Sequence, residues 1–420
     1  MKLLNIRFAP SPSGYLHIGN IRTILYNFAF SFKNKGNFFL RIEDSNLNIK
    51  YIKYIKNILN IFSIFNFNYK KKPFFQSKRN FYYLKFIKKL FKIKKVYFFF
   101  DKFKSIPIIK FKNNKKNIFK WKNFNKKIIS NYKFKDLIIR RSNNLYLYNF
   151  CVVVDDIKMK ISHIIRGDDH ISNTPNQICL YKSFKKKIPI YYHLPMILNN
   201  NGKKLSKKKK SFKILNFIKN NFLPETLLNY ISKLGWGFLN KEIYKINNFY
   251  NLFNIKNIKK SSSKINILKL NWINKYHLKY SNNIKIFKYI IIFLKNKKIK
   301  LKNYFKIIKI INIYKFNNIN FKNILNNIKY LYINNNKILS NFKKNKIIFD
   351  LYILFFKIIW KKKYINLIIN KIINIYKLKN YILNKFLRII IFKKKNTPSL
   401  ITIIKIIGKK KILNILYKYF

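Results

Sequence analysis

The chain has 420 residues and a mass of 51.3 kDa, which is too long for one ordinary domain and predicts two to four domains. Hydrophobic residues make up 49% of it, so the chain is not a disordered basic tail and can bury a large core. Lysine or asparagine interrupts every apolar run well short of the roughly 18 residues that a membrane-spanning helix needs, which argues against membrane insertion. Residues 1–10 give no sign of a signal peptide, so we expect a cytoplasmic protein.

The only cysteines, Cys151 and Cys179, suit a reduced compartment. Two cysteines exclude a disulfide framework and a four-cysteine zinc site.

The charge of the chain is extreme, with 92 Lys and Arg against 11 Asp and Glu and a formal net charge of +81. One interpretation is a polyanionic partner, most plausibly nucleic acid. The other is mutational, because Lys, Asn, Ile, Phe and Tyr have AT-rich codons and an AT-biased genome would enrich all of them. The two interpretations are compatible, and composition does not decide between them.

Arginine is conspicuous against this lysine background. Six of the eight arginines fall in three short segments, namely 7–41, 140–141 and 166. Because arginine offers a planar fork of donors that lysine cannot replace, this clustering suggests sites of bidentate recognition.

Residues 1–50 predict strand, loop, helix and strand. An apolar run at 3–9 is broken by the sequence PSPSG at 10–14, and apolar residues then recur at helical spacing from Ile21 to Phe32. Gly36 can end that helix, and residues 38–42 predict the next strand. This order, with a glycine-bearing loop before the helix, is typical of a nucleotide-binding α/β domain.

Later segments are less regular. Residues 70–135 show no clean period and are interpreted only as an insertion. The apolar run at 150–154 predicts a strand buried on both faces, and Asp155-Asp156 predicts a turn between strands. A lysine-rich loop occupies 200–211, and Pro224 opens a predicted helix. From about residue 243 helical periodicity dominates, which predicts an all-helical, strongly basic second half.

Residues 7–20, RFAPSPSGYLHIGN, lead from a turn into a helix. Free N–H groups at a helix N-terminus favour phosphate, Gly19 lets a nucleotide approach the backbone, and His17 can donate to a phosphoryl oxygen. A capped helix with His17 on the surface is the plain alternative.

Two further motifs complete the set. Residues 202–208, GKKLSKK, could place lysines on a triphosphate, although K-x-S-K arises about once by chance in so lysine-rich a chain. Residues 165–170, IRGDDH, contain Arg166, which could meet a carboxylate. Their Asp and His residues are interpreted as loop residues rather than metal ligands, because adjacent ligands rarely close a metal site.

Together these motifs resemble the glutamyl-tRNA synthetases of bacterial type, a family of class I aminoacyl-tRNA synthetases. Residues 7–20 are similar to the family's RFAPSPTGYLHIGG, and RIED at 41–44 follows as in the family. The central block at 148–170 and the stretch from HLP at 193–195 to the KLSKK loop, which resembles KMSKS, continue the match. LPE at 223–225, LGW at 234–236 and KLNWIN at 269–274 extend the resemblance to about residue 280.

The resemblance implies an α/β fold, with a Rossmann-type class I catalytic domain, an inserted acceptor-binding domain and a mainly α-helical C-terminal half. The expected division is 1–68 and 141–210 for the catalytic domain, 69–140 for the acceptor-end insertion, 211–290 for a stem-contact domain and 291–420 for a helical anticodon-binding region.

The resemblance also implies an activity. The enzyme would activate L-glutamate with ATP and Mg2+ and transfer it to tRNA(Glu), with the first step expected to need bound tRNA. Its partners would be tRNA(Glu), L-glutamate and ATP, with no membrane, and the chain would act as a monomer.

Site residues carry over by motif. The implied catalytic residues are His17 and Lys207. The implied ATP-binding residues are His17, Gly19, Asn20, Lys204 and Lys207. The implied glutamate-binding residues are Arg7, Ala9, Ser11, Glu43, Tyr148 and Arg166. Two arginines suit two carboxylates, and one carboxylate suits one ammonium group.

Two departures from the family pattern stand out. The insertion has YFFFD at 97–101 where some members carry paired zinc-binding cysteines, so we predict no zinc and no protein-bound metal. Asn20 stands where Gly or His is usual.

Other functions stay open at this stage. A glutaminyl-tRNA synthetase is disfavoured by the sequence APSP at 9–12, and a tRNA-modifying relative by the long helical half. An enzyme that also charges tRNA(Gln) and a non-catalytic basic RNA-binding protein of the same fold remain as alternatives.

Overall fold

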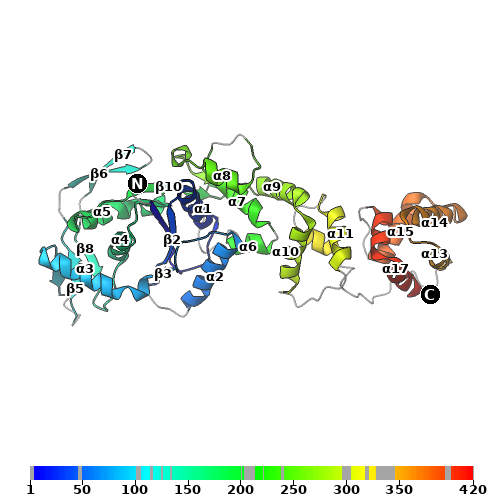
Figure 1. Cartoon of the computed structure of the whole chain (residues 1–420), viewed down its shortest axis with the longest axis horizontal. Helices are drawn as coiled ribbons and strands as arrows, with labels where there is room; N and C mark the ends of the chain where they lie inside the picture. The colour runs from blue at the N-terminus through cyan, green and yellow to red at the C-terminus, as the bar shows by residue number, and fades with distance from the viewer. Residues whose placement is uncertain are drawn as a thin grey trace. The chain divides into compact units, whose positions relative to one another are not determined.

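The structure of the protein is a computed structural model (Figure 1). It describes residues 4–45, 50–100, 106–113, 117–123, 126–132, 135–199, 201–202, 213–220, 222–237, 241–295, 304–316, 321–327, 346–392 and 399–419. The chain divides into two compact units, residues 1–219 with 224–270, and residues 220–223 with 271–420.

The first unit is built on a parallel sheet. Strand β1 (Asn5–Phe8), helix α1 (Ile18–Lys33) and strand β2 (Asn37–Ile42) confirm the predicted strand–loop–helix–strand opening. Helix α2 (Lys50–Ile64) then leads to the short strand β3 (Phe74–Phe75), and β2 pairs in parallel with both β1 and β3.

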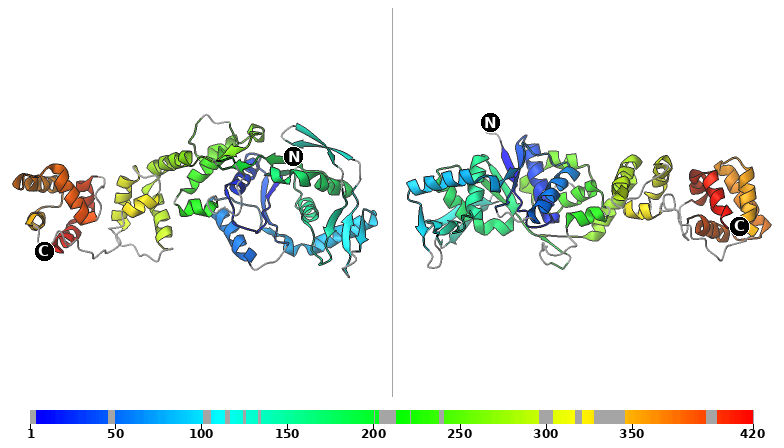
Figure 2. Two further views of the ribbon diagram at one scale, coloured as in Figure 1. Left: turned by 180° about the vertical axis from the view of Figure 1, so that it is seen from behind. Right: turned by 90° about the horizontal axis from the view of Figure 1, so that it is seen from below.

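A second sheet, in the strand order β7-β6-β10-β9, lies on the other side of β1. Strands β9 (His163–Gly167) and β10 (Ile190–Leu194) pair in parallel. The Ser162 amide donates to the Asn5 carbonyl at 3.0 Å, so β9 follows alongside β1. Strands β1 and β9 therefore lie beside each other where the two sheets meet, and ligands of open α/β sheets bind outside the carboxyl ends of the strands. Figure 2 shows these elements from two further sides.

The insertion contains short strands that the sequence did not reveal. Helix α3 (Asn80–Lys92) precedes an antiparallel sheet of β4 (Val96–Phe99), β5 (Ile108–Phe111) and β8 (Leu137–Arg140), in the order β4-β5-β8. Strands β6 (Asn117–Asn123) and β7 (Lys126–Tyr132) form an antiparallel hairpin. This hairpin joins the sheet of β9 and β10, because Asn123 of β6 pairs with Tyr191 of β10.

The prediction of a strand at 150–154 is wrong, because these residues belong to helix α4 (Tyr148–Lys158). Every residue from Phe150 to Asp156 is buried. A helix that is buried all round presents a continuous apolar run, so periodicity cannot separate it from a buried strand. The turn predicted at Asp155-Asp156 is wrong for the same reason, since both lie inside this helix.

The rest of the first unit packs around these layers. Its helices are α5 (Thr174–Ser183), α6 (Ile214–Lys219), α7 (Pro224–Ser232) and α8 (Ile246–Leu252), with 3₁₀ turns at Gln76–Lys78, Asp168–Asn173 and Ile255–Asn257. Strand β11 (Ile197–Leu198) pairs in parallel with β12 (Ser263–Lys264). Pro224 opens α7 as predicted, and Leu227, Leu228 and Ile231 are buried.

The second unit is helical throughout its described residues. Helix α9 (Ile267–Tyr280) crosses the boundary in sequence and is followed by α10 (Asn283–Lys295), α11 (Tyr304–Tyr314), α12 (Phe321–Asn327), α13 (Lys346–Lys357), α14 (Lys362–Ile375), α15 (Asn380–Phe392), α16 (Leu400–Ile407) and α17 (Lys409–Tyr417). Isoleucine is buried at 365, 368, 369 and 372 of α14, the spacing of one helix face. The helical second half is thus confirmed for these residues.

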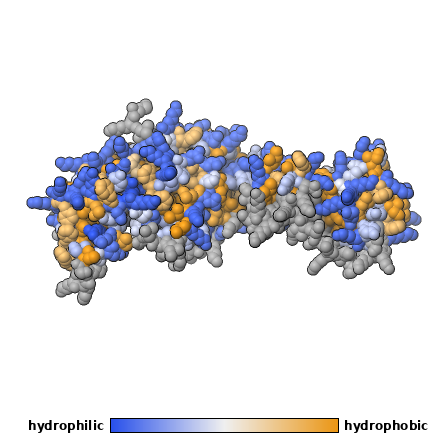
Figure 3. Space-filling view, turned by 60° about the horizontal axis from the view of Figure 1, so that its bottom comes forward, coloured by the Kyte–Doolittle hydropathy of each residue, from blue (hydrophilic) through white to orange (hydrophobic). Residues whose placement is uncertain are grey.

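The surface agrees with the composition. Hydrophilic residues are spread over the face drawn in Figure 3, with hydrophobic residues among them. No helix in the described part of the chain is both long and apolar enough to cross a membrane.

Candidate active site

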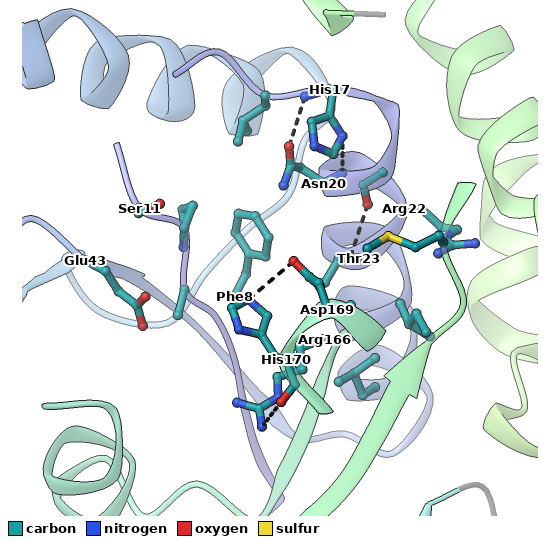
Figure 4. Close-up of a pocket in the computed structure, with 18 of the residues that line it drawn as sticks. Phe8, Ser11, His17, Asn20, Arg22, Thr23, Glu43, Arg166, Asp169 and His170 are labelled. Atoms are coloured by element: carbon teal, nitrogen blue, oxygen red, sulfur yellow. Dashed lines mark hydrogen bonds and ion pairs between the residues drawn. The ribbon is translucent and has the colours of Figure 1, made fainter. Parts of the chain in front are cut away.

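A cavity of about 500 Å³ opens where β1 and β9 end and α1 begins (Figure 4). Nine of the eleven predicted site residues line it, namely Arg7, Ala9, Ser11, His17, Gly19, Asn20, Glu43, Tyr148 and Arg166. The other two, Lys204 and Lys207, lie outside the described residues. Residues up to 159 positions apart in sequence therefore meet in one hollow, at the place where an open α/β sheet binds its ligands.

His17 is fixed at the N-terminus of α1 by a capping box. Its backbone N–H donates to Asn20 Oδ1 at 3.0 Å, and its ring Nδ1 accepts from the Asn20 N–H at 3.4 Å. Because Nδ1 is an acceptor, the neutral ring carries its proton on Nε2. His17 therefore offers this second nitrogen as a hydrogen-bond donor.

Gly19 and Asn20 both support the capping box of His17, a structural role that the sequence motif alone does not show. A Cβ atom at Gly19 would lie 2.9 Å from His17 Cε1, so a side chain there would displace the ring. Asn20 supplies the acceptor that satisfies the His17 N–H, which explains how an asparagine can stand at this position.

Arg7 lies at the floor of the cavity and is held by a carboxylate from a distant helix. Arg7 Nε donates to Asp156 Oδ1 at 3.2 Å, and Arg7 Nη2 donates to Asp156 Oδ2 at 3.5 Å. Arg41 Nη1 donates to the same Oδ1 at 2.5 Å. Arg41 Nη2 also donates to Glu43 Oε1 at 3.1 Å, which links Arg7, Asp156, Arg41 and Glu43 in one chain of ion pairs.

Burial and the neighbouring arginines have opposite effects on the pKa of a carboxyl group, and the balance differs between Asp156 and Glu43. Burial alone would raise the pKa of Asp156, but Arg41 and Arg7 outweigh it, and the pKa lies below the ordinary value. Burial dominates at Glu43 and raises its pKa, although Arg41 and Arg7 oppose the shift. Tyr148 also lines the cavity, and burial raises its pKa to about 12, so its hydroxyl keeps its proton at neutral pH.

Arg166 is held in another way, by neutral acceptors. Its Nη1 donates to Gln177 Oε1 at 2.9 Å, its Nη2 to Thr174 Oγ1 at 2.8 Å and to the His170 carbonyl at 3.2 Å, and its Nε to His193 Nε2 at 3.4 Å. Burial, with Arg166 and His170 adding to it, lowers the pKa of His193 to about 3, so this imidazole accepts as a neutral ring. Among the described residues, no carboxylate accepts a hydrogen bond from Arg166, which lines the cavity.

The described residues on both sides of the lysine-rich loop lie at this cavity. Ile197 of β11 is in its lining, seven positions before Lys204, the first residue of the KLSKK loop. On the other side, Lys213 forms a β-bridge with His17, and the Ile214 N–H donates to the Leu16 carbonyl at 3.0 Å. The described residues that follow the KLSKK loop therefore lie beside the start of α1, while Lys204 and Lys207 themselves are outside the described part of the chain.

Asp168 to Asn173 form a 3₁₀ turn after β9, in line with the interpretation of these residues as a loop. Asp169 and His170 line the cavity, with 3.8 Å between a His170 ring nitrogen and an Asp169 carboxylate oxygen. Within the part of the chain that the structure describes, no group of three or more His, Cys, Asp or Glu side chains is arranged to hold a metal ion.

Comparison with known proteins gives a consistent family. The family model described as "tRNA synthetases class I (E and Q), catalytic domain" matches residues 3–122 and 102–272. Glutamate–tRNA ligase of Buchnera aphidicola subsp. Cinara cedri is 38% identical over 454 residues, which cover 98% of this chain and 96% of the relative. Its counterpart from Buchnera aphidicola subsp. Acyrthosiphon pisum is 36% identical over 449 residues, with 97% and 96% covered.

Solved structures agree in fold. A glutamate tRNA ligase from Elizabethkingia meningosepticum, crystallised in complex with its amino acid, superimposes with a TM-score of 0.81 at 22% identity, over 100% of this chain and 99% of that one. Glutamate-tRNA synthetase from Elizabethkingia anophelis gives 0.80 at 22% identity, with the same coverage. Since the family model spans more than half of the chain and a relative above 30% identity matches nearly all of it, the chain belongs to the class I tRNA synthetases (E and Q), in their glutamate–tRNA ligase branch.

Proposed function

We propose that this chain is a glutamate–tRNA ligase that activates L-glutamate with ATP and transfers it to the 3′ end of tRNA(Glu). The observation that carries the proposal is the charge pattern of the cavity. Arg7 and Arg166 bring two guanidinium groups into a lining that also holds the Glu43 carboxylate and the start of α1. A ligand with two carboxylates and one ammonium group complements this arrangement.

Arg7 and Arg166 would each contact one carboxylate of glutamate. Two of the five N–H donors of Arg7 are directed to Asp156, which leaves the Nη1 group for substrate. Four of the five donors of Arg166 are directed to protein acceptors, so a two-bond contact with a carboxylate would exchange one of these bonds. Glu43 would accept from the ammonium group, and Ser11, Tyr148 and the Ala9 backbone would add hydrogen bonds.

Activation would proceed in line at the α-phosphorus of ATP, which enters as its magnesium complex. An oxygen of the glutamate α-carboxylate attacks that phosphorus, the bond to the bridging oxygen of pyrophosphate breaks, and glutamyl-adenylate forms. Negative charge develops on phosphoryl oxygens during this step, and donors already in place stabilise it most effectively. His17 Nε2–H and the backbone N–H groups of the first turn of α1, such as that of Gly19, would be such donors.

Lys204 and Lys207 would add positive charge from the loop whose ends lie at the cavity. Transfer then needs no second activation. A hydroxyl of the terminal tRNA ribose attacks the adenylate carbonyl carbon, AMP leaves, and an ester joins glutamate to the tRNA.

The remaining expectations follow the same proposal. The insertion at 69–140 would bind the acceptor end, residues 211–290 the stem, and the helical region at 291–420 the anticodon. The enzyme would act as a monomer in the cytoplasm.

Pyrophosphate exchange tests the proposal. Purified protein should exchange labelled pyrophosphate into ATP only when glutamate and tRNA are both present, and glutamine should not replace glutamate. If neither glutamate nor glutamine supports exchange, a non-catalytic RNA-binding protein is the alternative.

A further inference from the structure

We infer that Asp156 is a positioning residue, which fixes Arg7 and, through Arg41, Glu43 in the geometry that receives glutamate. The inference rests on the proposed function, since it takes Arg7 and Glu43 as glutamate-binding residues. Asp156 itself is absent from the cavity lining, so it would act on glutamate through these two side chains.

The geometry is that of a bridge between two separate arginines. Both oxygens of Asp156 are engaged, Oδ1 with Arg7 Nε and Arg41 Nη1, and Oδ2 with Arg7 Nη2. Two N–H donors of one guanidinium on two oxygens of one carboxylate set the plane of the arginine as well as its position. Asp156 is 1% exposed and Arg7 is 4% exposed, so water cannot take over this task.

The same carboxylate holds the other side of the substrate pocket. Arg41 is fully buried and lies between Asp156 and Glu43, which lines the cavity. Without Asp156, Arg41 would keep Glu43 and a weaker contact with Asp155, whose Oδ2 lies 4.0 Å from Arg41 Nε. Both Glu43 and Arg7 would then be without their common point of attachment to α4.

The neighbouring residue offers a matched control. Asp155 is equally buried in the same helix, but its hydrogen bonds go to Arg79 Nε, to Gln76 Nε2 at 2.8 Å and to the Tyr83 hydroxyl at 2.9 Å. None of these three partners lines the cavity. Replacement of Asp155 therefore removes a buried carboxylate from α4 without removing a hydrogen bond of Arg7 or Arg41, and loses only the 4.0 Å contact with Arg41.

The experiment compares the full-length variants Asp156→Asn, Asp156→Glu and Asp155→Asn with wild type in tRNA-dependent pyrophosphate exchange, with glutamate and ATP varied separately. In Asp156→Asn the amide nitrogen would face an arginine donor, and in Asp156→Glu the carboxylate keeps its charge but moves by one methylene. We expect both to raise the glutamate KM about tenfold or more, with the ATP KM within about twofold of wild type. Asp155→Asn should lower the melting temperature to a similar extent and leave the glutamate KM unchanged.

The outcomes separate the inference from the function. An Asp156 variant that folds and keeps the wild-type glutamate KM, or an equal rise in Asp155→Asn, overturns the inference. It is also overturned if neither Asp156 variant folds while Asp155→Asn does, because Asp156 would then be required for folding. The variant Arg7→Gln tests the function: if it leaves the glutamate KM unchanged, the role of Arg7 fails, whatever the Asp156 variants show.

Discussion

Arg166 combines a buried positive charge with a set of neutral acceptors. Gln177, Thr174 and His193 hold its guanidinium in place without neutralising it. An ion pair with Asp168 or Asp169 of the same loop is the plain alternative, but the hydrogen bonds of Arg166 within the described residues go to these three side chains and to the His170 carbonyl. Its charge is therefore available for the glutamate carboxylate that we propose it binds, and the surrounding acceptors suit its planar guanidinium group.

Arg166→Lys tests this interpretation. A lysine keeps the charge but cannot reach acceptors that lie around a planar group, so the cation should sit wrongly for a carboxylate. We expect kcat/KM for glutamate to fall by about ten- to a hundredfold, with the ATP KM little changed. Exposed Arg141 lies outside the cavity, and Arg141→Lys serves as the control. A variant that loses only thermal stability, or that affects ATP and glutamate equally, would contradict the role of Arg166.

His193 gives a prediction about pH. Its pKa in the folded protein is about 3 against an ordinary 6.5, so between these values the unfolded chain binds a proton that the folded chain does not. The neutral imidazole therefore contributes stability that is fully present above about pH 6.5 and is lost as the pH falls toward 3. In the variant His193→Gln this contribution is missing.

Melting temperatures of wild type and His193→Gln, measured between pH 7 and pH 4, check the sign. The difference between the two proteins should shrink as the pH falls. Curves that stay parallel over this range would show that His193 has no depressed pKa in the folded protein.

At the scale of elements, the opening β1–α1–β2 was predictable and α4 was not. The opening has a broken apolar run, a proline- and glycine-bearing turn and a helical period in sequence order. Helix α4 is buried on all sides, so its sequence has the continuous apolar character of a buried strand. In the insertion, strands β4, β5 and β8 escaped prediction because they have only four residues each.

The candidate site, too, was predictable from the sequence only in part. Nine residues came from local motifs, and they meet in one cavity. The residues that hold these side chains in place could not be predicted from local motifs. The hydrogen bond of Arg7 to Asp156 spans 149 positions, and that of Arg166 to His193 spans 27. A buried Asp-Asp pair inside an apolar run was the available signal, since buried carboxylates need cationic partners. Two adjacent aspartates are also typical of turns, and the prediction of a turn at this pair missed that signal.

The start of α1 gives a prediction about Asn20. Asn20→Ala removes the acceptor for the His17 N–H and should cost about 1 kcal/mol, or roughly 2–4 °C of melting temperature. Asn20→Asp keeps the acceptor and adds a negative charge that the helix N-terminus favours, so its stability should be preserved. Its ATP KM should nevertheless rise, because the carboxylate would repel the phosphates. If the Asn20→Asp enzyme has normal ATP kinetics, the ATP phosphates do not bind near the N-terminus of α1.

For the whole molecule, the open question is what the charge of +81 does. Exposed lysines of the second unit include Lys361, Lys362, Lys363, Lys371, Lys377 and Lys379. If they bind tRNA phosphates, their replacement by glutamine should weaken tRNA binding. The slope of log affinity against log salt should also become shallower, by up to about 0.9 for each phosphate that the variant no longer neutralises.

The same six lysines changed to arginine keep the charge and provide the control, which should bind tRNA as wild type does. An unchanged slope in the glutamine variant would assign the charge of these helices to codon composition rather than to RNA binding.

Aminoacylation tests the central claim most directly. Purified protein is incubated with ATP, magnesium and labelled glutamate or glutamine, together with tRNA(Glu), and the label attached to tRNA is measured. The structure and the family predict that glutamate is esterified to tRNA(Glu) and that glutamine is not. Absence of glutamyl-tRNA in the presence of folded protein, or attachment of glutamine in its place, would contradict the account.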